Sequence, residues 1–506
     1  MRNFTHSGKW NLPKKKSKFP GRLIFDEKNE TITLEIIGRK HLGNEPLFEK
    51  GPRGPQYQTI HTNSNYQHKH AIVNGYADQE ITLYNCTFLD FDTLGEDVYI
   101  VKYMVEFVFF GTSINSLEEL QIYSAIFKFP YLSTWYENNE SRHGTYFSFG
   151  EPEETKDDTE QSEIIKIDEN LEFVVIKDFT QSNQSNSPPN LRKAEKLLIF
   201  HYEVPISFDQ LLKDASHFNK LFKVSVGKQI RKKLLWISSK EFSIENVTNH
   251  YLDDKIPIGN YTLFKGSNID HIFTHERYML ISRPLTSKSE IDSAIVAWFK
   301  NKEFFTIYDI YIDTNNWSFG PKSGFSKTML NNRFLNVIQG LESYFNKTRK
   351  LDISRLKLLE TRQHEFELQK GKVLKLISDR KLKEWCNSNL TFSIKNNKNP
   401  SLEKILIEII SEFEEILNLI FVKNQVVELF PKIASKLRNT LSHGSNETTD
   451  QGQVLIPFYQ LGQILLASCI LKTISITDIQ YKIEHYDLFK KYIYEIQRTK
   501  IIFKNN

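Results

Sequence analysis

Cysteines are scarce in this chain, and their spacing fits neither a disulfide framework nor a metal site. Only three occur in 506 residues, at Cys86, Cys386 and Cys469, and no C-x-x-C pair is present. This excludes a disulfide-stapled secreted domain and a cysteine-based zinc site. Apolar runs of about 18 residues are also missing, and the first residues hold no apolar signal segment. We therefore expect a soluble cytoplasmic protein.

Motifs that define several common enzyme classes are missing too. Residues 320–327 (GPKSGFSK) lack the Gly-Lys-Ser/Thr of a phosphate-binding loop, and no G-x-S-x-G elbow occurs. His364 and Glu365 begin HEFEL rather than the H-E-x-x-H of a zinc protease. These patterns give no support for an NTPase, a serine hydrolase of the elbow type or a zincin.

The composition is that of an ordinary globular protein. Glycine and proline are few (21 and 16), 40% of residues are hydrophobic and 25% are charged, which excludes collagen-like and disordered chains. The length predicts about two to four domains. Charge is uneven: residues 326–506 hold 28 Lys/Arg against 19 Asp/Glu, and residues 1–325 hold 38 against 43. A mildly basic C-terminal part suits a polyanion such as RNA, although a solvated lysine-rich surface explains it equally well.

The first 320 residues are rich in short β-branched and aromatic runs separated by turn residues, the pattern of strands. One helix is expected at 208–222. The acidic stretch 151–170 and the polar stretch 181–190 are typical of loops, so we place a soft sub-boundary near 150–190; one large sandwich-like domain is nearly as well supported. The predicted strands are 31–37, 81–88, 98–110, 196–204, 234–238, 278–283 and 304–312.

After residues 317–324 the periodicity becomes helical. Apolar stripes at helical spacing run through 334–345, 402–420, 426–441 and 479–496, and 456–474 is apolar almost all round. A more polar helix or hairpin is expected at 351–386. Short linkers between helices favour an antiparallel bundle. The predicted fold class is α+β multidomain, with a β-rich region at 1–322 and a helical bundle at 323–506.

The segment 436–444 (KLRNTLSHG) carries the residues best suited to catalysis. Asn439 and His443 are four residues apart and share a helix face, and Gly444 favours a helix end beside the imidazole. The planar fork of Arg438 fits a phosphate, and histidine transfers protons near neutral pH. These groups together can cleave RNA without a metal. By spacing alone, a surface arginine beside a capping histidine is the commoner explanation.

These residues resemble the HEPN superfamily, whose ribonucleases carry R-x4-6-H with a polar residue after the arginine. Residues 333–345 (RFLNVIQGLESYF) resemble the opening HEPN helix of the ApeA group of bacterial anti-phage proteins, which join a β-rich N-terminal region to a C-terminal HEPN domain. The resemblance implies Arg438 and His443 as catalytic residues, Asn439 as their polar support and Glu342 as an auxiliary residue.

The same resemblance implies a biological role and partners. It implies an endoribonuclease that forms 2′,3′-cyclic phosphates without a metal or organic cofactor. Its substrate would be host RNA, with tRNA as the candidate, and its trigger a phage component sensed by the N-terminal region. HEPN domains typically pair two-fold, so a homodimer is expected. Two alternatives stay open: a non-catalytic RNA- or protein-binding HEPN module, and a ligand- or carbohydrate-binding β-domain with a helical oligomerisation tail.

Overall fold

The protein is described here from a computed structural model, in which two compact units are formed by residues 1–219 with 230–274 and by residues 220–229 with 275–506. Each unit is described by itself. The described residues are 4–12, 17–26, 31–39, 72–94, 98–111, 113–129, 131–136, 163–178, 195–227, 232–239, 241, 243, 279–281, 286–314, 327–349, 353–390, 400–421, 424–442 and 452–499.

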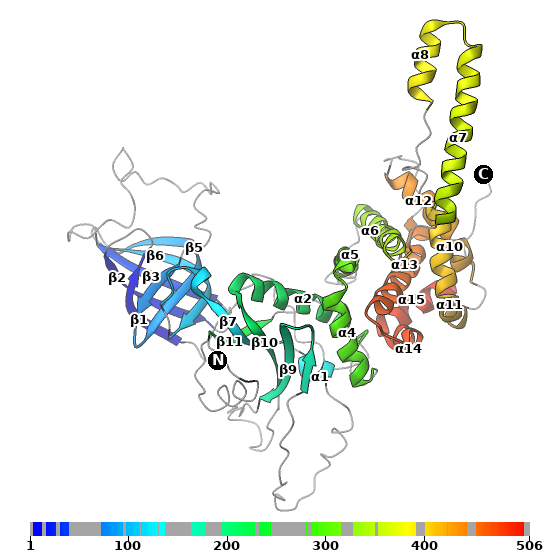
Figure 1. The fold of residues 1–506 in the computed structure, drawn as a ribbon. Helices are drawn as coiled ribbons and strands as arrows, with labels where there is room; N and C mark the ends of the chain where they lie inside the picture. Colours follow the sequence, from blue (N-terminus) through cyan, green and yellow to red (C-terminus); the bar gives the residue numbers. More distant parts are fainter. Residues whose placement is uncertain are drawn as a thin grey trace, which may run out of the picture. The chain divides into compact units, whose positions relative to one another are not determined.

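The first six strands form a closed antiparallel barrel (Figure 1). Their order around it is β1-β2-β3-β6-β5-β4, and pairing of β1 with β4 closes it. The strands are β1 (Phe4–Asn11), β2 (Lys18–Asp26), β3 (Thr31–Arg39), β4 (Val73–Tyr76), β5 (Glu80–Leu94) and β6 (Val98–Phe110).

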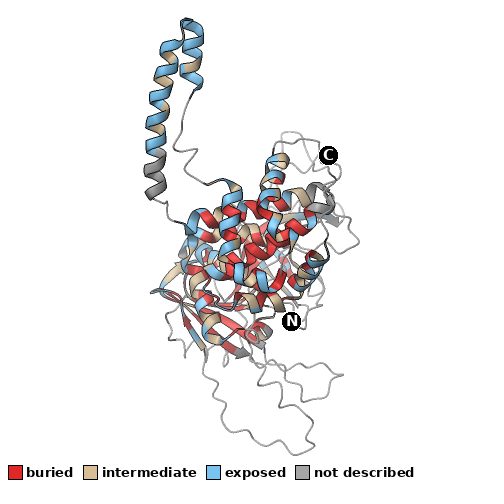
Figure 2. Ribbon diagram, turned by 90° about the vertical axis from the view of Figure 1, so that its right-hand side faces the viewer, coloured by how far each residue is buried: buried red, intermediate tan, exposed pale blue. Residues whose placement is uncertain are grey.

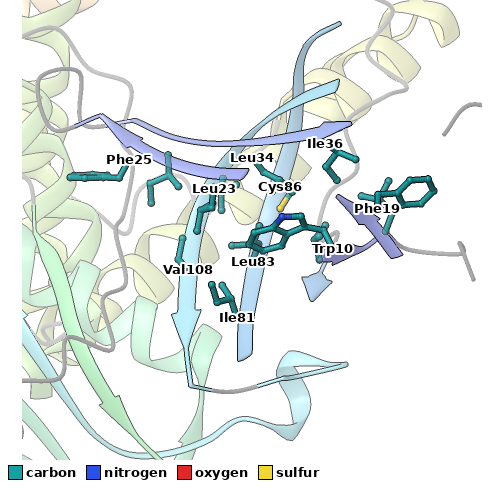
Figure 3. Close-up of a cluster of buried hydrophobic side chains, with 14 of the residues drawn as sticks. Trp10, Phe19, Leu23, Phe25, Leu34, Ile36, Ile81, Leu83, Cys86 and Val108 are labelled. Carbon is teal, nitrogen blue, oxygen red and sulfur yellow. The ribbon is translucent and has the colours of Figure 1, made fainter. Parts of the chain in front are cut away.

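The barrel interior is filled by apolar side chains (Figure 3). Along β2 they alternate with more exposed residues, whereas residues 81–84 of β5 and 107–110 of β6 are buried in succession. Trp10 is fully buried at the β1–β4 seam, where it pairs with Gly75. A Cβ atom at Gly75 would overlap the Trp10 ring, and one at Gly21 would overlap the backbone of β3. Glycine at these two positions therefore lets the indole fill the barrel where the strands close.

A second, five-stranded antiparallel sheet has the order β11-β7-β10-β9-β8. Helix α2 (Phe208–Val226) follows directly after β10, and its Phe218 ring contacts Phe129, Trp135, Phe173 and Phe200 with centroids 4.9–6.2 Å apart. This aromatic cluster holds the helix on the sheet. The strands are β7 (Gln121–Lys128), β8 (Glu163–Lys166), β9 (Leu171–Asp178), β10 (Glu195–Ser207) and β11 (Lys233–Ser238), with η2 (Leu117–Glu119) and α1 (Leu132–Tyr136) around them.

The β-rich character of the N-terminal region is confirmed, but its topology differs from a sandwich in containing a closed barrel. The five-stranded sheet takes β7 from before the stretch 150–190, β8 and β9 from within it, and β10 and β11 from after it, so the sub-boundary expected there falls within that sheet. Within residues 1–22, β1 and the first part of β2 are strands of the barrel. The expected loops 151–162 and 181–190 lie outside the described residues.

The strand predicted at 304–312 is wrong: helix α5 (Phe305–Thr314) occupies this segment. Its aromatic and β-branched residues mimic a strand, yet the buried ones, Ile307, Tyr308 and Tyr311, recur at helical spacing. Met279–Ile281, the described core of the strand predicted at 278–283, is not a strand either.

The C-terminal region is helical, as predicted, and α13 (Gly452–Thr473) is its centre. Most described residues of α13 are buried, on all faces of the helix, as expected for a core helix. By length and composition α13 could cross a membrane, but it is largely buried within the bundle. The remaining helices are α4 (Lys288–Lys300), η6 (Lys302–Phe304), α6 (Lys327–Thr348), α7 (Ile353–Leu376), α8 (Arg380–Asn389), α10 (Leu402–Glu412), α11 (Glu414–Phe421), α12 (Gln425–Ser442), α14 (Ile479–His485) and α15 (Asp487–Arg498).

Helices α4 and α5 belong to the helical unit. The Asn301 side chain donates to the carbonyl of Thr473 (2.7 Å), and the hydroxyl of Tyr459 on α13 donates to the carbonyl of Thr314 (2.7 Å). The compact helical unit therefore begins well before the boundary expected at 322/323.

This packing predicts different stabilities for two fragments. Fragment 286–506 keeps α4 and α5, whereas fragment 326–506 lacks the buried Tyr308 and Tyr311 and exposes the surface that they cover. Because each large apolar side chain contributes about 1.5–3 kcal/mol when buried, the longer fragment should melt at least about 5 °C higher. Thermal unfolding followed by circular dichroism measures this difference. Equal melting temperatures would show that α4 and α5 are dispensable to the bundle.

Candidate functional site

Helix α12 positions two of the predicted site residues at the edge of its buried face. Leu437 points into the core, so Arg438, one residue further round the helix, is half-buried at the boundary and Asn439 is exposed. The Arg438 guanidinium donates from Nη1 to Oδ1 of Asn439 at 3.4 Å. The guanidinium of Arg438 and the side-chain amide of Asn439 thus lie next to each other at the surface of α12.

Glu342 on α6 lies against this arginine. Its carboxylate oxygen Oε2 is 3.7 Å from Nη2 of Arg438, and the two side chains are 25% and 42% exposed. Glu342 follows the fully buried Leu341, so the α6 core stripe sets its position in the same way that Leu437 sets the position of Arg438. The structure thus joins Arg438, Asn439 and Glu342 from two helices far apart in the sequence.

Burial and the neighbouring charge act on Glu342 in opposite directions. Desolvation is the larger effect and raises the pKa of Glu342 above its ordinary value, while the positive charge of Arg438 lowers it. The charge of Arg438 therefore offsets part of the cost of burying this carboxylate. In turn, the carboxylate fixes the side of the guanidinium that faces α6 and leaves the other side half-exposed.

His443 lies outside the described residues, since the description of α12 ends at Ser442. The structure therefore brings together three of the four predicted residues and does not place the fourth. Among the residues that it describes, no group of three or more His, Cys, Asp or Glu side chains could hold a metal ion.

Sequence reasoning overlooked two lysines on the same helix. Lys432 and Lys436 are exposed, and with Asn439 they form an i, i+4, i+7 row on α12. Position 443 continues this spacing. The signal was present as cationic residues alternating with the apolar stripe of α12, a pattern also typical of a solvated helix face. The two lysines of this row place positive charge beside Arg438, and such charge attracts phosphate groups.

Comparison with protein-family models gives two matches. Residues 5–301 match the ApeA N-terminal domain 1, and residues 335–480 match the Apea-like HEPN domain. Comparison with the curated proteins and with the solved structures found no match. The first model alone spans more than half of the chain, and the second contains every predicted site residue.

The chain belongs to the ApeA-like HEPN family of anti-phage proteins. Its HEPN domain includes α6, which carries Glu342, and α12, which carries Arg438 and Asn439. Family membership supports a nuclease-type defence function. The resemblance inferred from the motif and the opening helix is thereby confirmed.

The Glu342–Arg438 pair in this HEPN domain makes a thermodynamic prediction. Arg438→Ala should destabilise the protein near neutral pH, because it leaves a partly buried carboxylate without its counter-charge. Glu342→Gln combined with Arg438→Ala should recover most of the loss. For a pair this exposed, we expect a coupling of about 0.2–1 kcal/mol. Urea unfolding of the four proteins in this double-mutant cycle measures it.

The pH dependence supplies the control. Since the folded-state pKa of Glu342 is raised, the folded protein binds this proton more tightly than the unfolded chain does, and ionisation of Glu342 lowers stability as pH rises through the folded value. The penalty of Arg438→Ala should therefore shrink when Glu342 is protonated. A penalty that is independent of pH would show that the pair carries no electrostatic coupling.

Proposed function

We propose that this protein is a metal-independent endoribonuclease whose site is formed by Arg438, Asn439 and His443, with Glu342 as a positioning residue. The observation that carries the proposal is the half-exposed Arg438 guanidinium, held between Glu342 and Asn439 within the HEPN-matched segment. The exposed side of the guanidinium can donate hydrogen bonds to a phosphate, and His443 follows five positions later in the sequence.

The proposed reaction is transfer of phosphorus to the adjacent ribose hydroxyl. A base removes the 2′-OH proton, the 2′ oxygen bonds to phosphorus, and the bond from phosphorus to the 5′ oxygen breaks. The leaving oxygen takes up a proton, which gives a 2′,3′-cyclic phosphate and a 5′-OH. His443 serves in proton transfer, and Arg438 stabilises the negative charge that develops on the phosphoryl oxygens. Asn439 orients the guanidinium or a phosphate oxygen.

We further propose that two copies pair through the HEPN domain and bring two motifs into one cleft. Each motif is small, so a two-fold contact would supply additional phosphate-binding groups. In this proposal the protein is cytoplasmic and uses no cofactor. A phage component acting on the N-terminal region releases the nuclease, which cuts host RNA, with tRNA as the candidate, and causes abortive infection.

A non-catalytic binding module is the second candidate. The exposed lysine row on α12 and the guanidinium of Arg438 suffice to hold a phosphate without cutting it. In that case the motif would contribute affinity but no turnover. The two candidates differ in whether RNA ends appear.

Substitution of the motif tests the chemistry. His443→Ala and Arg438→Ala should each lower the rate of RNA cleavage by about 10²–10⁴. Arg438→Lys should not restore it, since an ammonium group lacks the planar fork. Asn439→Ala should have a milder effect. Purified protein is incubated with total RNA in EDTA, and the product ends are mapped for cyclic phosphate.

The matched control is Ser442→Ala, which changes an exposed residue of the same helix. This variant should cleave RNA at the parent rate. Retention of full cleavage and full phage protection by both alanine variants would assign the motif a structural or binding role instead. Glu342→Gln should retain RNA binding, because it leaves Arg438 in place, but should lower the cleavage rate by about tenfold through looser positioning of the guanidinium.

Pairing of the motifs can be tested with two inactive chains. If a site takes Arg438 from one copy and His443 from the other, co-expressed Arg438→Ala and His443→Ala chains should form mixed dimers with one complete site. Activity should then return to about a quarter of the parent value in the purified mixture. Light scattering verifies the dimer. Mixed dimers without recovered activity would place each complete site within one chain.

A further inference from the structure

Helices α7 and α8 form a hairpin whose side chains, over the described residues 360–389, contribute nothing to the buried core. No residue of Glu360–Asn389 is buried, and Figure 2 shows both helices coloured as exposed or intermediate over that length. Packing of an amphipathic face normally supplies most of the stability of a helix. A two-helix segment kept on the outside of its unit therefore requires another explanation than core formation.

The hairpin nevertheless has its own internal contacts. Lys370 Nζ on α7 donates to the carbonyl of Asn387 on α8 at 2.8 Å. The Asp379 carboxylate caps α8 by accepting from the Leu382 amide at 2.9 Å. Arg380 pairs with Glu384 at 3.1 Å one turn along α8. These bonds define the turn and the start of the second helix.

The same contacts leave the end of the hairpin positive. Residues 369–389 contain six Lys/Arg and two Asp/Glu, and the two acidic residues are the ones engaged in capping and in the pair with Arg380. Four lysines are exposed: Lys372, Lys375, Lys381 and Lys383. Among the described residues, none of these four ammonium groups has a hydrogen-bond or ion-pair partner. This concentration of positive charge is the electrostatic signature of a polyanion-binding surface.

A large aromatic ring lies within this positive surface. Trp385 is 60% exposed, one helical turn after Lys381, and Leu376 near the turn is 83% exposed. An exposed indole one helical turn from a lysine can stack on an unpaired base while the lysines contact the backbone. A protein-binding surface is less well matched, because lysine is depleted at protein interfaces.

We propose that the α7–α8 hairpin is an RNA-binding arm of the HEPN domain, in which Trp385 stacks on an unpaired base and the four exposed lysines contact phosphates. The choice of RNA rests on the proposed ribonuclease function. The arm adds the class of RNA: one that offers unpaired bases beside backbone phosphates, such as a stem-loop. Helix α7 begins five residues after α6 ends, so the arm is joined directly to the helix that carries Glu342.

The experiment measures binding rather than cleavage, so it is independent of the chemistry. Full-length protein carrying His443→Ala is titrated into a fluorescein-labelled RNA stem-loop and into a fully paired RNA duplex. Three further variants are made in this background: Trp385→Ala, a four-lysine-to-glutamine variant of the arm, and the control Lys300→Gln with Lys302→Gln, two exposed lysines of the same unit outside the arm. Fluorescence anisotropy reports affinity, and light scattering reports the size of the free protein.

We expect Trp385→Ala to weaken stem-loop binding about tenfold and to leave duplex binding nearly unchanged. The lysine variant should weaken both and reduce the dependence of log affinity on log salt by up to about 2–3. The control should match the parent. Arm variants that bind both RNAs as tightly as the control overturn the proposal while leaving the ribonuclease intact. A change in oligomer size with unchanged affinity also overturns it and assigns the arm to a second copy of the chain. A parent that binds neither RNA counts against the proposed function as well.

Discussion

The close packing of α6 against α13 is the contact on which the helical unit depends. A Cβ atom at Gly462 of α13 would press into Val337 of α6, and one at Gly340 of α6 would press into Leu466 of α13. Small residues on each helix therefore let the two backbones approach closely. α13 is buried on every side because α5, α12 and α15 surround it as well. The packing that fixes α6 therefore also fixes the position of Glu342, which is the acidic partner of Arg438.

The Glu342–Arg438 ion pair is weak enough to leave the guanidinium able to bind a ligand. A pair that is a quarter to two-fifths exposed is stabilised little by its own attraction, and burial already raises the pKa of Glu342. A phosphate, in contrast, can take two hydrogen bonds from one guanidinium. Glu342 therefore restricts the directions available to Arg438 without competing strongly for its charge. Stable orientation with an open ligand-binding side is the combination that a phosphoryl-transfer site requires.

How much of this could be predicted from sequence depended on the range of the interactions. Strands such as β6 follow from runs of β-branched and aromatic residues, and helices such as α2 follow from apolar residues at helical spacing. Closure of the barrel requires Trp10 to pair with Gly75, and no local sequence pattern indicates that β1 pairs with β4. The residue types of α5 favour a strand, so the sequence predicts one there, although its buried positions recur at helical spacing.

The site shows the same division. Arg438 and Asn439 stand in one short motif and were found there, whereas their contact with Glu342 joins positions on different helices that only the bundle brings together. Glu342 was reached through resemblance of the opening helix, not through any pattern linking it to Arg438. The sequence predicts only a polar helix or hairpin for the segment that contains the basic end of the α7–α8 hairpin, and it does not single out the lysine row on α12. Charge on a helix face has the same sequence pattern whether it faces solvent or a ligand.

The separation of buried from unburied residues explains how one domain can satisfy two different chemical demands. The proposed cleavage would require a few groups held to within fractions of an ångström, and the candidate groups Arg438 and Glu342 follow the core residues Leu437 and Leu341. Capture of a long polyanion requires many charges and tolerates mobility, and this demand suits a hairpin with no buried residue in Glu360–Asn389. Burying the arm would place its lysines in a low-dielectric interior at a large desolvation cost. The charge that would make the arm useful to RNA is therefore also the reason that it stays outside the core.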